Sequence, residues 1–85
     1  MIYQVVLTKT AEKELFKLDK TQIKSVSKII DSMVENPRPK GFKKLRGQIG
    51  LFRIRKGELR IIYSIDDKNK IIVIAIIGNR KDVYK

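Results

Sequence analysis

The residues with the clearest chemical potential in this sequence are its arginines, which are unevenly distributed. All six lie after residue 37, at Arg38, Arg46, Arg53, Arg55, Arg60 and Arg80. Residues 38–85 carry fourteen basic and four acidic side chains, whereas residues 1–37 carry six and five. Arginine suits phosphate because its planar guanidinium donates two parallel hydrogen bonds. The distribution favours a phosphate-binding surface, and the alternative is a solvated face on which arginines gather by chance.

Composition excludes several kinds of catalytic chemistry. The 85 residues carry a net charge of +11 and include neither His nor Cys. The chain therefore lacks disulfides, a thiol nucleophile and a Ser-His-Asp triad, and it lacks the commonest metal ligand and proton shuttle. The adjacent carboxylates of Asp66 and Asp67 are flanked by Lys68 and Lys70, which argues against a metal pair. We expect no metal ion or other cofactor, and a polyanionic partner.

The tight turn after residue 55 sets which arginines face each other across a predicted β-hairpin. A turn at Lys56–Gly57 brings Arg53 opposite Arg60, whereas a turn at Gly57–Glu58 brings Arg55 opposite Arg60. Like charges directly across a strand pair destabilise it by roughly 0.2–1 kcal/mol. Either register therefore favours a site for an anionic ligand. The alternative is an exposed face on which arginine stems cover apolar neighbours.

The carboxy-terminal tail supplies two further candidates. Arg80 and Tyr84 are four residues apart, so one helical turn would place them on the same side. The tail follows the last predicted strand and should emerge beside the hairpin. Tyr84 could stack on a base or exchange a proton, because nearby cations favour the phenolate and lower the pKa of its hydroxyl. The alternative is that Tyr84 belongs to a frayed terminus.

The hydrophobic pattern predicts the scaffold that must position these side chains. Residues 2–7 read as a strand, and Thr8 or Thr10 caps a helix whose apolar face is Ala11, Leu15 and Leu18. Asp19 and Gln22 resemble a capping box that opens a second helix, which ends at about Asn36 before Pro37. The predicted apolar stripe of that helix is Ile23, Val26, Ile30, Met33 and Val34.

After residue 42 the pattern changes from helical to alternating. Residues 43–46 predict a short edge strand, residues 51–56 and 58–65 a hairpin, and residues 71–77 a strand covered on both faces. The prediction is one α+β domain over residues 1–85: an N-terminal strand, an antiparallel helical hairpin, then a mostly antiparallel sheet of three to four strands. The longest apolar run has seven residues and no signal-type segment opens the chain, so we expect a cytoplasmic protein with no membrane partner.

Four short motifs, in this order and spacing, resemble the RelE/ParE superfamily of toxins from type II toxin–antitoxin systems. They are Lys44-Leu45-Arg46-Gly47, Phe52-Arg53-Ile54-Arg55, Leu59-Arg60-Ile61-Ile62-Tyr63 and Gly78-Asn79-Arg80-Lys81-Asp82-Val83-Tyr84. The resemblance covers nearly the whole chain and implies a RelE-like fold. It also implies the activity of the RelE branch, which is metal-independent cleavage of messenger RNA in the ribosomal A site.

The resemblance implies a role for each matching residue. Arg53 and Arg55 stand where the branch usually has a pair of lysines, and arginine stays protonated, so they would hold RNA rather than transfer protons. Arg60 and Arg80 would stabilise charge on the phosphate during attack by the RNA 2′-hydroxyl, and Tyr84 would act as base or stacking platform. Further RNA contacts are expected from Lys44, Arg46 and Lys81.

The resemblance also implies partners and leaves two alternatives. The partners are the ribosome, messenger RNA and an acidic RelB-like antitoxin. The first alternative is a ParE-like toxin that inhibits DNA gyrase without catalysis. The second is a plain nucleic-acid-binding module.

Overall fold

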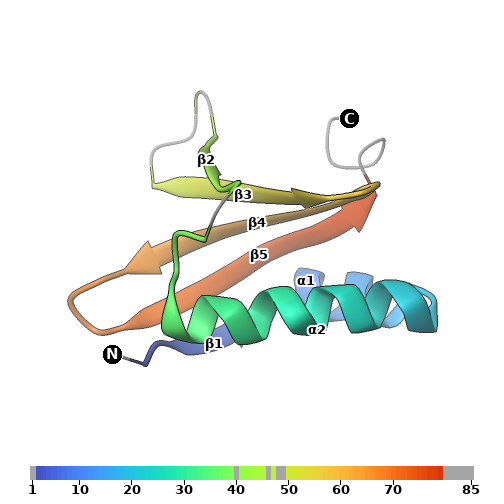
Figure 1. The fold of residues 1–85 in the computed structure, drawn as a ribbon, viewed down its shortest axis with the longest axis horizontal. Helices are drawn as coiled ribbons and strands as arrows, with labels where there is room; N and C mark the ends of the chain where they lie inside the picture. The colour runs from blue at the N-terminus through green and yellow to red at the C-terminus, as the bar shows by residue number, and fades with distance from the viewer. Residues whose placement is uncertain (1, 40, 46, 48–49, 80–85) are drawn as a thin grey trace.

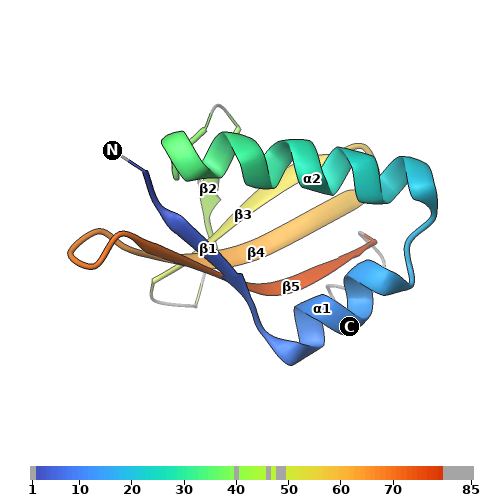
Figure 2. The same ribbon diagram turned by 90° about the horizontal axis from the view of Figure 1, so that it is seen from below.

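The protein is a five-stranded mixed sheet with two helices on one face (Figures 1 and 2). The computed structural model describes residues 2–39, 41–45, 47 and 50–79. Within them the elements are β1 (Gln4–Leu7), α1 (Lys9–Phe16), α2 (Lys20–Glu35), β2 (Lys43–Lys44), β3 (Leu51–Lys56), β4 (Leu59–Asp66) and β5 (Ile71–Asn79). The strand order is β1-β5-β4-β3-β2; β1 pairs with β5 in parallel and the other pairs are antiparallel. The predicted α+β class is confirmed.

Side-chain caps set where both helices begin. The Thr8 hydroxyl accepts a hydrogen bond from the Ala11 backbone N–H at 3.1 Å and caps α1. At α2, the Asp19 carboxylate accepts from the Gln22 backbone N–H at 2.8 Å, and the Gln22 side chain accepts from the Asp19 N–H at 3.4 Å. The predicted capping box is confirmed, and it satisfies donors that a helix start leaves free.

The core lies between the helices and the sheet, and it shows one error in the predicted face of α2. The buried residues of α2 are Val26, Ile29 and Met33, whereas Ile23 and Ile30 are half-buried. Ile29 was absent from the predicted stripe. The helix is rotated slightly from the predicted orientation, because a 3.6-residue period fits a 26-29-33 row as well as a 23-26-30 row. No described helix is long and apolar enough to cross a membrane.

A β-bulge changes which residues of β5 face the core. Tyr63 pairs with Ile74 but the preceding Ile62 pairs with Ile76, so Ala75 is the extra residue. A bulge moves the alternation of side chains by one position. Consequently Ile74 and Ile77 both reach the core, although an unbroken strand would place residues three apart on opposite faces.

The β3–β4 hairpin takes the second of the two registers considered from the sequence. Ile54 lies opposite Ile61, and Arg55 lies opposite Arg60. The two turn residues are Gly57 and Glu58, and Gly57 has a φ of +60°. Glycine at the first turn position with positive φ is the pattern of a type II′ turn, which matches the twist of the flanking strands. The turn therefore fixes the arginine pair.

Candidate anion-binding site

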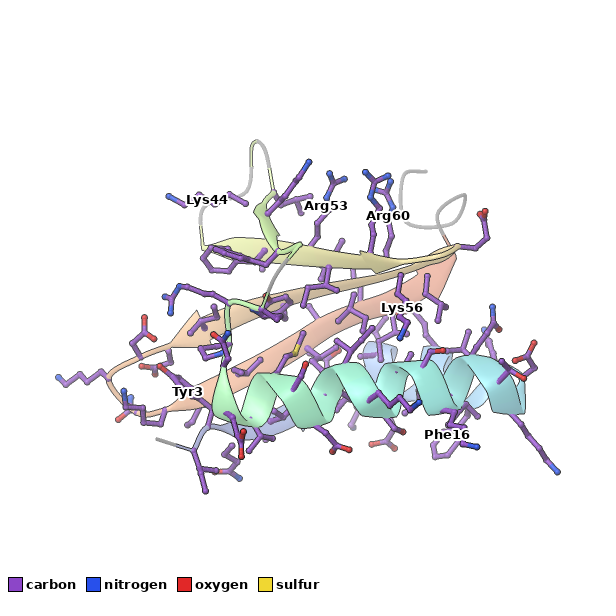
Figure 3. All side chains as sticks on the ribbon, viewed as in Figure 1. Tyr3, Phe16, Lys44, Arg53, Lys56 and Arg60 are labelled. Atoms are coloured by element: carbon purple, nitrogen blue, oxygen red, sulfur yellow. The ribbon has the colours of Figure 1, made fainter. Side chains whose placement is uncertain are left out.

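Basic side chains gather on the sheet face opposite the helices. Arg53 pairs with Ile62 and Arg55 with Arg60, while Ile54 and Ile61 belong to the core on the other face. Figure 3 shows Arg53 and Arg60 projecting from the sheet on the side away from the helices. The register adds Lys43, which lies opposite Arg53. We call Lys43, Arg53, Arg55 and Arg60 the arginine face.

The members of the arginine face differ sharply in exposure. Arg60 is only 2% exposed, and its Nε and Nη1 atoms are fully buried. Arg53 is half-buried and Arg55 is exposed. Withdrawing a guanidinium from water carries a desolvation cost of several kcal/mol, so folding alone gives little reason to bury one across from a second arginine. Ile62, beside Arg60 on this face, is 4% exposed, which agrees with arginine stems covering it.

The end of β5 borders the most buried arginine. Gly78 is the Cα partner of Arg60, and Asn79 is the partner of Leu59. The last described residue, Asn79, therefore lies beside the hairpin, and the predicted position of the rest of the tail falls outside the described residues. Four of the residues predicted for the site, Arg46, Arg80, Lys81 and Tyr84, lie outside the described residues.

The edge strand β2 places Lys43 on the arginine face, next to Lys44, the lysine predicted to contact RNA. Lys44 lies opposite Phe52, a residue packed against the core, and is exposed. Its contact with RNA stays a prediction. Lys43 is the partner of Arg53 and shares its face. The sequence signal for Lys43 was the two-residue alternation itself, which could be applied only once the register of this short strand was known.

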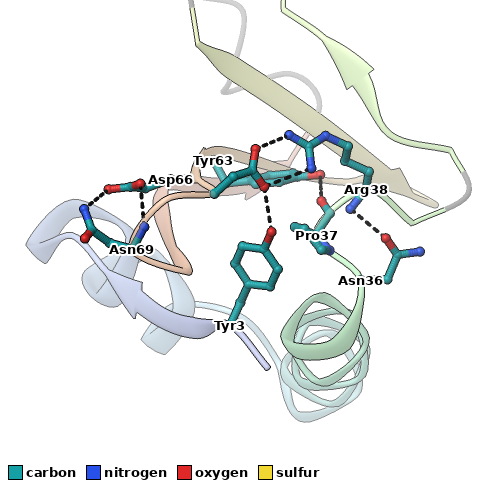
Figure 4. Close-up of polar contacts among 8 residues, drawn as sticks. Tyr3, Asn36, Pro37, Arg38, Tyr63, Asp66 and Asn69 are labelled. Atoms are coloured by element: carbon teal, nitrogen blue, oxygen red, sulfur yellow. Dashed lines mark hydrogen bonds and ion pairs between the residues drawn. The ribbon is translucent and has the colours of Figure 1, made fainter. Parts of the chain in front are cut away.

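A second polar cluster involves the remaining described arginine, Arg38, at the β4–β5 turn (Figure 4). The Arg38 guanidinium donates to both carboxylate oxygens of Asp67, with Nη2 to Oδ2 at 2.7 Å and Nη1 to Oδ1 at 3.2 Å. The Tyr3 hydroxyl donates to the same carboxylate at 2.6 Å. These hydrogen bonds, that of Arg38 above all, lower the pKa of Asp67 to about 2. We call Tyr3, Arg38 and Asp67 the paired cluster.

The carboxylates considered as a weak metal pair are thus both bound by protein donors. Asp66 accepts from the Asn69 backbone N–H at 3.0 Å and from its side-chain amide at 2.8 Å, and these hydrogen bonds lower the pKa of Asp66. Asp67 is held by the paired cluster. Among the described residues, no group of three or more possible metal ligands is present.

Arg38 also belongs to the anchor of the connector between α2 and β2. The Tyr63 hydroxyl, in the core, donates to the Pro37 carbonyl at 2.9 Å. Burial raises the pKa of the Tyr63 hydroxyl to about 12. The Phe52 ring lies between Phe42 and Tyr63, with centroids 5.8 and 6.0 Å away. These contacts hold the connector against the sheet, and Arg38 directly follows the anchored residue Pro37.

The arginine face can bind and orient an anion, but its three arginines cannot remove a proton. All four are cationic donors, and arginine does not deprotonate in proteins. Fixed guanidinium groups aimed at one place stabilise negative charge that develops during a reaction. A phosphodiester fits this arrangement, and any base must come from elsewhere.

The fold and this face define a class of small basic α+β domains, with two helices on one side of the sheet and a basic surface on the other. Residues 5–84 match the family model described as ParE toxin of type II toxin-antitoxin system, parDE. The chain belongs to this family of toxins, which confirms the resemblance drawn from the four motifs.

Individual relatives point to the RelE branch. Toxin RelG of Mycobacterium tuberculosis is 31% identical over 86 residues, which span 100% of this chain and 99% of that protein. In the archaeal RelE–RelB complex from Pyrococcus horikoshii OT3, the matching chain is 32% identical with a TM-score of 0.82, covering 94% of this chain and 97% of that one. The RelBE2 toxin–antitoxin complex of M. tuberculosis gives 30% identity and a TM-score of 0.82, covering 94% and 100%. The chain is therefore a toxin of a type II toxin–antitoxin system, with RelE-type relatives.

Proposed function

We propose that this toxin is an endoribonuclease that cleaves messenger RNA on the ribosome, without a metal ion of its own. The observation that supports the proposal most is the placement of Arg60. It is almost fully buried, lies opposite Arg55 and borders the last described residues of β5. A guanidinium held in one position by the surrounding sheet can stabilise negative charge on a phosphate without first having to reorganise.

In the proposed reaction, the RNA 2′-hydroxyl attacks the adjacent phosphorus and the 5′-oxygen leaves. The products are a 2′,3′-cyclic phosphate and a 5′-hydroxyl. Arg60 stabilises charge on the phosphoryl oxygens, and Arg53 and Arg55 hold the RNA backbone together with Lys43. Arg80 stabilises the phosphate or the leaving oxygen. Tyr84 accepts the 2′-hydroxyl proton or stacks on a base.

Dependence on the ribosome follows from what the face lacks. The chain has no histidine, and the arginine face supplies only cations, so free RNA gains charge stabilisation without a conventional acid–base pair. Positioning of reactants can be worth several kcal/mol of the barrier. We propose that the ribosome supplies this positioning, holding the RNA against Arg60 in the geometry of in-line attack.

The decisive experiment incubates the toxin with translating ribosomes and maps the new RNA ends. We expect cleavage by the wild type and a loss of about 10²- to 10³-fold in Arg60→Ala, the usual effect of removing a donor that stabilises an oxyanion. Tyr84→Phe should also lose activity. Arg38→Ala is the matched control, because it removes an arginine from the paired cluster. Wild-type rates in Arg60→Ala and Tyr84→Phe, with unchanged circular dichroism, would remove both residues from the mechanism.

We also propose an acidic, RelB-like antitoxin as the physiological partner. Beside the arginine face the same side of the sheet carries apolar surface: Val6 is 37% exposed, and Val73 and Ile76 are half-buried. An amphipathic helix laid there could place carboxylates against Arg53 and Arg55. The charge of +11 should make association fast at low salt and slower as salt rises. Co-expression with a neighbouring open reading frame that yields neither a co-purifying partner nor relief of growth arrest would contradict this.

The family match supports one alternative of a different class. The matching model is described by the ParE toxin, and a ParE-like inhibitor of DNA gyrase would use the basic face for binding alone. Such a protein would block supercoiling by purified gyrase and leave RNA on translating ribosomes intact. The two assays run side by side separate the alternatives.

A further inference from the structure

The carboxy-terminal half of β5 has helix α1, rather than a strand, along its outer edge. β5 is nine residues long, but β1 is four residues long and pairs with Ile71 to Ile74 alone. Figure 2 shows α1 lying beside the rest of β5, past the point where β1 ends. An open strand edge exposes backbone donors and acceptors, and proteins cover or protect such edges.

Two side chains of the α1 segment take the place of the missing strand. The Thr8 hydroxyl donates to the carbonyl of Ala75, the bulge residue, at 2.9 Å. The Glu14 Oε1 atom accepts from the Ile77 backbone N–H at 3.1 Å. Ile77 is fully buried, and a buried N–H without an acceptor costs about 1–3 kcal/mol. Glu14 is therefore the group that fixes the last part of β5 to the helix layer.

The position of this hydrogen bond connects it to the arginine face. Ile77 pairs with Ile61, and the next residue, Gly78, pairs with Arg60. The hydrogen-bonded residue, Ile77, therefore immediately precedes Gly78, the partner of Arg60. It comes three residues before Arg80 in the sequence. The Glu14 side-chain oxygen is the acceptor of this bond, and a helix is a rigid support for it.

We propose that Glu14 is a positioning residue for the arginine face. By holding the Ile77 amide, it keeps Gly78 beside Arg60. Its effect on catalysis rests on the proposed RNA cleavage, whereas its effect on the structure around Arg60 does not. α1 buries Ala11 completely and packs Leu15 against the core, and the Glu14 hydrogen bond adds a polar contact to β5.

The test compares Glu14→Ala, Glu14→Asp and Glu14→Gln with the control Glu12→Ala, which removes a carboxylate from the exposed side of the same helix. Amide exchange at Ile77 and the NMR signal of the Arg60 Nε–H report on structure. We expect both to exchange about tenfold faster in Glu14→Ala. The shorter Glu14→Asp should behave similarly, and Glu14→Gln, which keeps an acceptor oxygen, should stay close to wild type. Glu12→Ala should change neither signal.

Cleavage on programmed ribosomes supplies the functional readout. We expect Glu14→Ala to lower kcat about tenfold with KM unchanged, because misplacement of a catalytic group costs rate rather than binding. Glu14→Gln should restore kcat. An unchanged Arg60 signal in Glu14→Ala, equal loss in Glu14→Gln, or a normal kcat despite a mobile Ile77 amide would overturn the proposal. If the wild type cuts no RNA, the proposed function fails, and the two NMR signals still decide whether Glu14 positions Arg60.

Discussion

Arg38 and Arg60 are the same residue type in opposite settings. Arg38 is 41% exposed in its side chain and makes a bidentate ion pair with Asp67, whose carboxylate also accepts from Tyr3. Arg60 is 2% exposed and lies directly across from Arg55. In the first setting, the positive charge of Arg38 is balanced by a carboxylate of the same chain. The second brings two guanidinium groups of like charge together on one face of the sheet.

The difference teaches how to separate structural from functional cations in a strongly basic protein. The paired cluster joins three segments, namely the residues just before β1, the connector after α2 and the β4–β5 turn. These hydrogen bonds join separate parts of the chain, so a structural role is enough to explain them. The arginine face costs stability by bringing like charges together and by withdrawing a guanidinium from water. A feature that opposes folding points to binding or catalysis.

The largest expected difference is between the lysine variants of these two arginines. We expect Arg60→Lys to lower ribosome-dependent cleavage by about 10²-fold, since an ammonium lacks the planar fork that binds phosphate through two donors. Arg38→Lys should cleave at close to the wild-type rate, because an exposed ion pair contributes little and tolerates the exchange. Single-turnover cleavage assays on the two variants measure this. Equal losses of cleavage rate in both variants would show that the two arginines do not differ in function.

A smaller effect is expected on stability from Tyr63→Phe, beside the paired cluster. Loss of the hydroxyl leaves the Pro37 carbonyl without its donor, and we expect about 1–2 kcal/mol of destabilisation in urea unfolding. The folded-state pKa of Tyr63, about 12, exceeds the ordinary value of 10.0. The stability it contributes is therefore complete below pH 10 and is lost as pH rises toward 12. The phenylalanine variant should lack this particular loss.

Much of the fold was predictable because local chemistry determined it. The Asp19–Gln22 capping box and Pro37 bounded α2, and Gly57 limited the hairpin to two registers. The choice between those registers depends on how the whole sheet packs, and the alternation of charges near the turn fits both. The face of α2 was misplaced by omitting Ile29 for a similar reason, since core contacts rather than period select among adjacent rows.

The candidate site was predictable in composition and less so in geometry. Alternation along β3 and β4 was enough to place Arg53, Arg55 and Arg60 on one face. The burial of Arg60 and the inclusion of Lys43 required the assembled sheet, because both depend on neighbours distant in sequence. The pairing of Arg38 with Asp67 joins residues 29 positions apart, and a charge count cannot distinguish such a paired arginine from a ligand-binding one.

Removing charge from the exposed member of the arginine face should have opposite effects on folding and on binding. In Arg55→Gln we expect a gain in stability of roughly 0.2–1 kcal/mol, because the repulsion with Arg60 is relieved. The same change should weaken binding of a single-stranded RNA and reduce its salt dependence by about one ion. Lys56→Gln, at the next position of β3 but opposite Leu59, is the control. A loss of stability in Arg55→Gln would show that the arginines support the fold.

The smallest effect should be the pH response of the paired cluster. Hydrogen bonds from Arg38 and Tyr3 lower the pKa of Asp67 to about 2, against about 3.9 in an unfolded chain. The folded state therefore holds fewer protons than the unfolded state between these values, and stability falls as pH falls. We expect Asp67→Asn to melt at a lower Tm than wild type above pH 4, with the difference shrinking as pH falls toward 2. Calorimetric melts of both proteins at matched salt measure it, and Asp31→Asn, on the exposed side of α2, controls for the lost charge. A difference in Tm that stayed constant from pH 6 to pH 2 would mean that the ionised carboxylate is not what joins Arg38 to Tyr3.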